Sequence, residues 1–157
     1  MFGKLNNEQI ETVIHDEFID RIGCHAEDIT YVVPISYAYD GEYVYGHTFE
    51  GMKVNMMRKN PKLCFEVDDM HNLANWQSVI AWGEFEELKP GPEKDNAVKL
   101  LMNRALPFIH SETMQLSAQW PFPVSDPIAI DGIIFRIRLE KKTGRFEKSD
   151  SGYFFAS

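Results

Sequence analysis

The alternation of apolar and polar positions predicts a chain of strands interrupted by a few helices. Near the N-terminus, NNEQIETVIHDE begins with asparagines, which cap helices, and places Ile10, Val13 and Ile14 on one helical face. A strand is expected next, in FIDRIGCHA. After Gly51, MKVNMMRKN predicts a two-turn helix that stops before Pro61, because a residue that precedes proline avoids the helical region.

The clearest β signal is ITYVVPISYAYDGEYVYGHT, in which two runs rich in Val, Ile and Tyr flank Asp40-Gly41. An Asp-Gly dipeptide is typical of a tight hairpin turn. Pro34 interrupts the first run, and proline cannot donate to a β ladder, so it marks an edge, a bulge or a gap in pairing. Such a gap leaves neighbouring backbone groups available to a ligand.

The second half of the chain continues the β pattern around one longer helix. KLCFEVDD and WQSVIAWGEFEEL alternate like strands, and Gly83 predicts a bulge or a close backbone approach. PGPEKDNAVKLLMNRAL predicts a helix with Val98, Leu101 and Met102 on its apolar side, followed by the irregular segment PFIHSETMQLSAQWPFPVSDP. IAIDGIIFRIRLEKKTGRFEK contains the last strand, and the tail SDSGYFFAS is expected to be loosely held.

About five to seven strands and two to three helices, without strict βαβ alternation, predict a mainly β (α+β) fold. We expect a small antiparallel barrel with helices packed at its rim. The chain of 157 residues has the size of one domain, and no linker or repeat divides it, so residues 1–157 are expected to form a single domain.

Composition and charge narrow the possible partners. Hydrophobic residues make up 44% of the chain and the net charge is −8, so bulk charge favours neither nucleic acid nor an anionic membrane. No signal peptide is expected, and no apolar run approaches the ~20 residues of a membrane span, which predicts a cytoplasmic protein. Cys24 and Cys64 lack the spacing of a zinc or redox motif and are expected to be buried free thiols.

The stretch YVYGHTFEGMKVNMMRKNP places a histidine, a hydroxyl and a lysine where a strand turns into a helix. The free N–H groups and the dipole of a first helical turn favour anions, so Thr48 and Lys53 could converge on one phosphate. Arg58 lies farther along the helix and is a less direct contributor. Spacing alone favours the plainer interpretation, in which Lys53, Arg58 and Lys59 form the solvated face of a surface helix.

The histidines do not settle the chemistry. His47 is either catalytic or simply structural, and residue type favours the second interpretation. No histidine has metal-ligand spacing with another His, Cys or carboxylate, so no metal site is expected. The chain has no recognisable Ser/His/Asp context, no Walker-type loop and no dinucleotide fingerprint.

The order of motifs from Tyr31 to Leu88 resembles the flavin-binding split-barrel family, which includes pyridoxamine-phosphate oxidase and the nitroimidazole-resistance (Nim) proteins. The matching features are VP with an alternating strand, a hairpin, HT at a strand end, G-x-K opening a helix that ends in NP, and then CFEV and W-x-S-V. The strand FRIRLEKKTGR extends the resemblance, which is closest to the Nim type, to about three quarters of the chain.

The resemblance implies an antiparallel split β-barrel and a homodimer that binds FMN at the subunit interface. It implies that Lys53 holds the FMN phosphate together with the turn at His47-Thr48 and Gly51. It also implies that His47 lies near the flavin and a small aromatic substrate as the catalytic residue. The remaining residues implied to line the flavin are, along the ring, Val33, Pro34, Ile35 and Ser36, and, from either subunit, Trp76, Gln77, Ser78 and Val79.

This chain also departs from the oxidase pattern. Met52 stands where the oxidase commonly has an arginine, Gln77 and Ser78 replace its RQ pair, and its substrate-binding W…R pattern is not recognisable. These departures argue against pyridoxamine-phosphate oxidation. Three interpretations remain. The first is an FMN-dependent oxidoreductase that passes electrons to a small aromatic or nitro compound. The second is a non-catalytic flavin or haem carrier on the same fold, and the third is a structural domain that has lost its ligand.

Two further features have alternative interpretations. Trp120-Pro121-Phe122 is either a lid over the flavin or a loop that covers the core. Gly144-Arg145 either reaches a phosphate or ends a strand with a solvated arginine, and the second is favoured.

Overall fold

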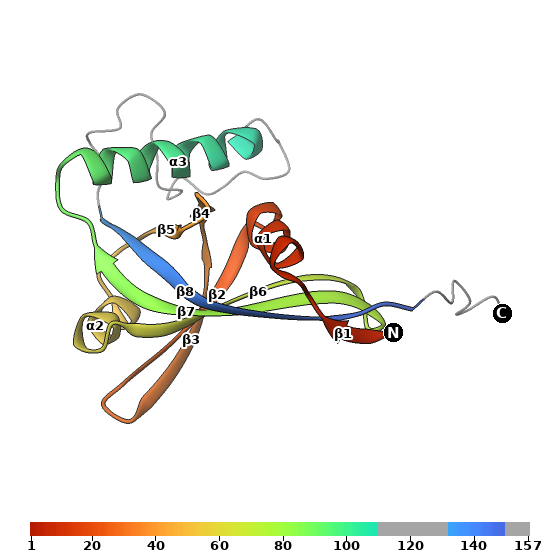
Figure 1. Ribbon diagram of the computed structural model, residues 1–157. Helices are drawn as coiled ribbons and strands as arrows, with labels where there is room; N and C mark the ends of the chain where they lie inside the picture. The colour runs from red at the N-terminus through yellow and green to blue at the C-terminus, as the bar shows by residue number, and fades with distance from the viewer. Residues whose placement is uncertain (110–131, 150–157) are drawn as a thin grey trace.

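The computed structural model describes residues 1–109 and 132–149, with the side chains of residues 105–109 left aside. Its described part contains eight strands and three helices (Figure 1). The strands are β1 (Phe2–Lys4), β2 (Ile19–Ala26), β3 (Ile29–Ser36), β4 (Ala38–Tyr39), β5 (Tyr43–Thr48), β6 (Lys62–Asn72), β7 (Asn75–Glu87) and β8 (Ile133–Glu147). The helices are α1 (Asn7–Asp16), α2 (Met52–Lys59) and α3 (Pro92–Ile109).

All strand pairs are antiparallel and belong to one sheet of order β3-β2-β6-β7-β8-β5-β4, with β1 added on β8. The sheet curls into a split barrel, and β3 and β5 approach each other across it. The predicted mainly β barrel with peripheral helices is therefore confirmed. The single domain over residues 1–157 stays a prediction, because part of that range is not described.

The interior of the barrel follows from strict alternation along the strands. On β2, Asp20, Ile22, Cys24 and Ala26 are buried while their neighbours are more exposed. The same alternation on β6 and β7 directs large apolar side chains inward, and Phe65 of β6 is fully buried. We call the opposite side of strands β3, β2, β6 and β7 the outer face.

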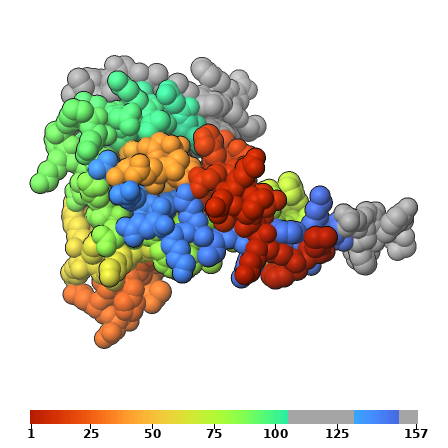
Figure 2. Space-filling view, in the orientation of Figure 1, coloured from red at the N-terminus to blue at the C-terminus, as the bar shows by residue number. Residues whose placement is uncertain are grey.

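The helices close the ends of this interior. α1 begins with a capping box between Asn6 and Gln9, and it buries Ile10, Val13 and Ile14 as predicted. Figure 2 shows this N-terminal segment, in red, lying against β8, in blue. α2 buries Val54, Met56 and Met57. α3 covers a second, smaller apolar cluster that includes Val98 and Leu101.

The predicted hairpin at Asp40-Gly41 is confirmed, but it joins only the short strand β4 to β5. Asp40 closes it by accepting hydrogen bonds from the N–H groups of Glu42 at 2.9 Å and Tyr43 at 2.7 Å. The first apolar run pairs instead with β2. A separate turn at Glu27 and Asp28, with φ of 52° and 61°, makes that connection.

Some predicted boundaries were wrong. The strand count exceeds the expected number because β1 and β4 have only three and two residues, too few for a periodic pattern. The third helix was expected to end with Leu106, the last residue of PGPEKDNAVKLLMNRAL, but it continues to Ile109. The tail, apart from Ser149, and residues 110–127 of the predicted irregular segment lie outside the described residues.

Both cysteines are free thiols, as predicted, and they lie on different sides of the sheet. Cys24 is buried in the interior, and burial raises the pKa of its thiol. Cys64 is only partly buried and faces outward, where its sulfur would lie 2.7 Å from a Cβ added at Gly23. The expectation that both thiols are buried therefore holds for Cys24 alone.

Gly83 confirms both parts of its prediction. The register between β7 and β8 shifts at this point, because Trp82 pairs with Lys141 while Gly83 pairs with Leu139. A Cβ added at Gly83 would lie 2.1 Å from the carbonyl oxygen of Arg138. The close contact therefore requires glycine at the position of the bulge.

Gly83→Ala should destabilise the protein by about 3 kcal/mol, because the new methyl group cannot fit without moving the β8 backbone. Urea unfolding should show a lower midpoint with an unchanged slope. The exposed neighbour Glu84, which pairs with Arg138, provides the control: Glu84→Ala should change stability by less than about 0.5 kcal/mol. Equal midpoints for the two variants would contradict this account of Gly83.

Candidate functional site

The corner between β5 and α2 places His47 and Thr48 side by side at a strand end. His47 pairs with Ile134 of β8, and its ring packs edge-to-face on Phe49 with centroids 5.1 Å apart. Thr48 is buried, and its hydroxyl donates a long hydrogen bond of 3.4 Å to the carbonyl oxygen of Phe49. A hydroxyl held this weakly can rotate toward a ligand that reaches the corner.

Gly132 lies close against this corner. It was not identified as a site residue from the sequence. Its φ of +100° favours glycine. An added Cβ would lie 2.7 Å from the carbonyl oxygen of Thr48 and 2.8 Å from Nε2 of His47. The Asp131-Gly132 dipeptide before the last strand was the available signal, because such dipeptides mark turns.

The start of α2 presents backbone donors next to Thr48. Gly51 precedes the helix in an extended conformation, and no side chain caps the first turn. The first-turn N–H groups of a helix lack partners within the helix itself. The corner therefore combines a hydroxyl with uncapped backbone N–H groups, a combination that suits an anion.

Lys53 adds a cation within this first turn. Its side chain is half-buried, and burial lowers the pKa of its ammonium group while the nearby Asp20 opposes that effect. Lys53 has no ion pair with any residue in the described part of the chain. A partly desolvated cation without a counter-ion interacts strongly with an incoming phosphate.

Asp20 is a second residue that the sequence analysis missed. It lies on β2, is fully buried, and neither carboxyl oxygen has a hydrogen-bond partner among the described residues. Burial raises the pKa of this carboxyl well above its usual range; Glu66 adds to the effect, whereas Lys53 and Arg21 oppose it. The signal was its position in phase with the apolar residues of FIDRIGCHA.

Arg58 is held away from the corner by two carboxylates. It contacts Glu50 at 2.8 Å and Glu87 at 2.9 Å, with two hydrogen bonds to each. Glu50 belongs to the loop between Thr48 and Gly51, so Arg58 ties this loop to the end of β7. Its geometry agrees with the indirect role expected from the sequence.

The strand β3 lies at the edge of the sheet, one of the alternatives that Pro34 predicted, so one side of its backbone pairs with no other described strand. Val33 and Ile35 face the interior, Pro34 is exposed and Ser36 is partly buried. Ile35 pairs with Asp20 across the ladder, and the field of Asp20 reaches Lys53. The end of β3 and the corner therefore belong to one region.

The structure does not bring all four predicted site residues of β7 to the corner of their own chain. These residues are Trp76, Gln77, Ser78 and Val79. Trp76 pairs with Met70 near the end of β6 that is remote from α2 (Figure 1), and its indole N–H donates to Glu147 at 3.2 Å. Trp76 and Gln77 line a cavity of about 310 Å³ there. Ser78 donates to Glu66 at 3.1 Å on the outer face, and Val79 is fully buried inside the barrel.

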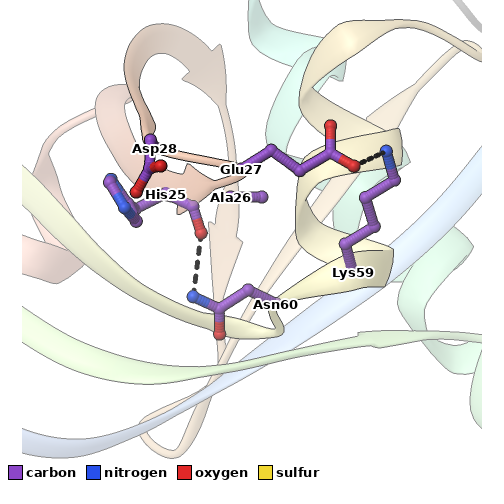
Figure 3. Close-up of a pocket in the computed structure, with 6 residues that line it drawn as sticks. All are labelled: His25, Ala26, Glu27, Asp28, Lys59 and Asn60. Carbon is purple, nitrogen blue, oxygen red and sulfur yellow. Dashed lines mark hydrogen bonds and ion pairs between the residues drawn. The ribbon is translucent and has the colours of Figure 1, made fainter.

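A separate hollow of about 590 Å³ lies at the C-terminal end of α2 (Figure 3). Two of its polar side chains already have partners: Lys59 pairs with Glu27 at 2.8 Å, and the amide of Asn60 donates to the carbonyl oxygen of His25 at 2.8 Å. None of the predicted site residues lines it. We therefore place the candidate site at the corner and not in this hollow.

Two sequence-based expectations remain, one for the Trp120-Pro121-Phe122 segment and one for Arg145. Trp120, Pro121 and Phe122 lie outside the described residues, so their role as a lid stays a prediction. Arg145 is exposed on β8 and pairs across the ladder with Ser78. That position agrees with a solvated arginine near a strand end.

Comparisons with known proteins agree with this architecture. Over 84 residues the chain is 31% identical to an uncharacterised protein of Rhizobium meliloti, covering 54% of the chain and 56% of that protein. The chain thus spans about half the length of this curated relative.

No helix in the described ranges is both long and apolar enough to cross a membrane.

Two solved structures share the fold. An FAD-binding protein from Mesorhizobium loti is 26% identical with a TM-score of 0.72, covering 94% of this chain and 99% of that one. A candidate 5-nitroimidazole antibiotic resistance protein from Bacteroides thetaiotaomicron is 19% identical with a TM-score of 0.69, covering 93% and 87% of the two chains.

The family model described as pyridoxamine 5'-phosphate oxidase matches residues 6–125, about three quarters of the sequence. This match spans α1, the whole corner and strands β2 to β7. The chain belongs to the pyridoxamine 5'-phosphate oxidase family.

Proposed function

We propose that this protein binds FMN at the corner between β5 and α2 and acts as an FMN-dependent oxidoreductase on a small aromatic or nitro compound. The observation that carries the proposal is the half-buried Lys53, without an ion pair in the described structure, beside the uncapped start of α2. The names of the FAD-binding and nitroimidazole-resistance neighbours support a flavin as the ligand and a nitro compound as the substrate.

The chain's own groups fit the phosphate and the ring separately. Lys53, the hydroxyl of Thr48 and the first-turn N–H groups of α2 would hold the phosphate. The unpaired edge of β3, from Val33 to Ser36, offers backbone groups along the ring. Bound FMN supplies the electron-transfer chemistry, while the protein orients it and excludes water.

His47 is the residue that we assign to proton delivery or substrate orientation. It is partly buried at the end of β5, and its ring packs edge-to-face on Phe49 in the neighbourhood of Gly132. Imidazole exchanges protons near neutral pH, so a histidine in this position can supply a proton to a substrate that accepts electrons.

We further propose that a second copy completes the site. The outer face exposes five large apolar residues, which a soluble monomer would not normally gather on one sheet face. They are Ile19, Val32, Met70, Ile80 and Trp82. Trp76 and Gln77, which lie away from the corner of their own chain, would approach the flavin of the partner.

Lys53→Ala should weaken FMN binding by about 1.5–3 kcal/mol, because it removes a charge-assisted contact with the phosphate. Titration of the purified protein with FMN, followed by visible absorbance or fluorescence, measures the loss. Lys59→Ala removes the same charge from the other end of α2, where the ammonium pairs with Glu27, and should leave affinity unchanged. A protein that gains no flavin absorbance would refute the proposed cofactor.

His47→Gln should slow the transfer of electrons to substrate by about 10²-fold while the flavin stays bound. Reoxidation of the chemically reduced flavin by a nitroimidazole, followed by stopped-flow absorbance without oxygen, gives the rate. His15→Gln on the exposed side of α1 is the control. If the wild-type protein binds FMN but never passes electrons to an acceptor, the carrier interpretation replaces the enzyme.

Trp82→Glu should convert a homodimer to monomers, because it places a charge among the exposed apolar residues of the outer face. Light scattering after size-exclusion chromatography measures the mass. Thr12→Glu adds the same charge on exposed α1, on the other side of the sheet, and should leave the dimer intact. A monomeric wild-type protein would contradict the proposed assembly.

A further inference from the structure

Asp20 is a buried acid that the fold itself does not use. It is fully buried on β2, and no described residue donates a hydrogen bond to either of its carboxyl oxygens. A buried polar group without a partner is rare and calls for an explanation, and a buried carboxylate is far more costly than a neutral carboxyl. Its presence on the apolar side of a strand therefore indicates a role outside core packing.

The groups that act on Asp20 come from four parts of the fold. Glu66 on β6, Arg21 on β2 and Lys53 on α2 influence it electrostatically, and Asp20 in turn acts on the hydroxyl of Tyr37. Three of these groups are already engaged: Arg21 pairs with Glu66, and also with Asp68, on the outer face, and Tyr37 donates its hydrogen bond to the carbonyl oxygen of Ile14.

Lys53 is the group that remains available. Within residues 1–109 and 132–149 it has no ion pair, and Asp20 is the charged group whose field stabilises its ammonium form. The same ammonium is the proposed phosphate ligand. One cation is thus shared between a buried acid on β2 and the anion site at the start of α2.

We propose that Asp20 is a positioning residue of the phosphate site, carrying a proton while phosphate occupies Lys53 and competing for the Lys53 ammonium when it loses that proton. This role rests on the proposed FMN site. Binding of the phosphate to the ionised form transfers one proton from solvent to the Asp20 carboxylate, and no other bond changes. A neutral Asp20 leaves the whole charge of Lys53 to the phosphate.

The coupling between proton binding by Asp20 and FMN binding sets the direction in which FMN affinity changes with pH. Burial raises the pKa of Asp20 in the free protein, and a phosphate dianion beside Lys53 raises it further. Between these two pKa values, FMN binding takes up a proton, so affinity falls as the pH rises through that window. The phosphate of FMN behaves oppositely, because contact with Lys53 favours its dianion and releases a proton.

The test is calorimetric titration with FMN at several pH values, in buffers of different ionisation enthalpy, for the wild type and Asp20→Asn. We expect the wild type to lose affinity relative to the variant, by up to about tenfold per pH unit inside the window, because one proton is involved. We also expect the wild type to take up more protons than the variant on binding. Riboflavin, which lacks the phosphate, should show no such difference.

The possible outcomes distinguish a failure of the proposed role of Asp20 from a failure of the proposed FMN site. Parallel pH profiles and equal proton counts for the two proteins would reduce Asp20 to a structural residue while leaving the FMN site intact. If Asp20→Asn does not fold, the wild type decides alone: proton uptake with FMN but not with riboflavin supports the role, and net release with both overturns it. A wild type that binds no FMN would refute the proposed function and this role together.

Discussion

The structure depends on the long antiparallel pairing of β7 with β8. β8 pairs with β7 along one edge and with β5 and β1 along the other. The end of β5 at Thr48, where the corner begins, is therefore held in place by β8. The pairing includes a register shift at Gly83, where the β8 backbone approaches too closely for any side chain. The shift lies between the part of β8 that pairs with β5 and the part that pairs with β1.

Burial within this framework determines how strongly the charged groups of the candidate site interact. Lys53 lies partly within the protein beside α2, and a cation in such a place interacts more strongly with an anion than a cation on the open surface. The cost of that placement is lowered by Asp20, whose carboxyl lies within electrostatic reach. Desolvation therefore links Asp20 on β2 with Lys53 on α2, and it supports our proposal that the corner binds a phosphate.

The arrangement also separates cofactor binding from assembly. The proposed phosphate contacts belong to the corner of one chain, whereas Trp76 and Gln77 lie at the other end of β6. The exposed apolar residues of the outer face lie on the strands that connect the two regions. In the dimer that we propose, a complete site would need two copies, and the proposed activity would depend on dimer formation.

The sequence by itself determined the elements whose residues repeat with a clear period. Alternation predicted β6, β7 and β8, the apolar face of α1 followed from Ile10, Val13 and Ile14, and the order of motifs located Thr48 and Lys53 at a strand-to-helix corner. The glycine at position 83 was identified because strands rarely contain one without a bulge. These features are local, so a local pattern is sufficient to reveal them.

Only the tertiary structure decided which strands pair and which groups share the site. β3 pairs with β2 and not with β5, because the turn at Glu27 and Asp28 and the burial of Tyr37 redirect the chain before the Asp40-Gly41 hairpin. Asp20 and Gly132 reach the corner from segments far away in sequence, and no periodicity reports such a contact. Burial decides whether a carboxyl is charged, and burial is a property of the packed molecule.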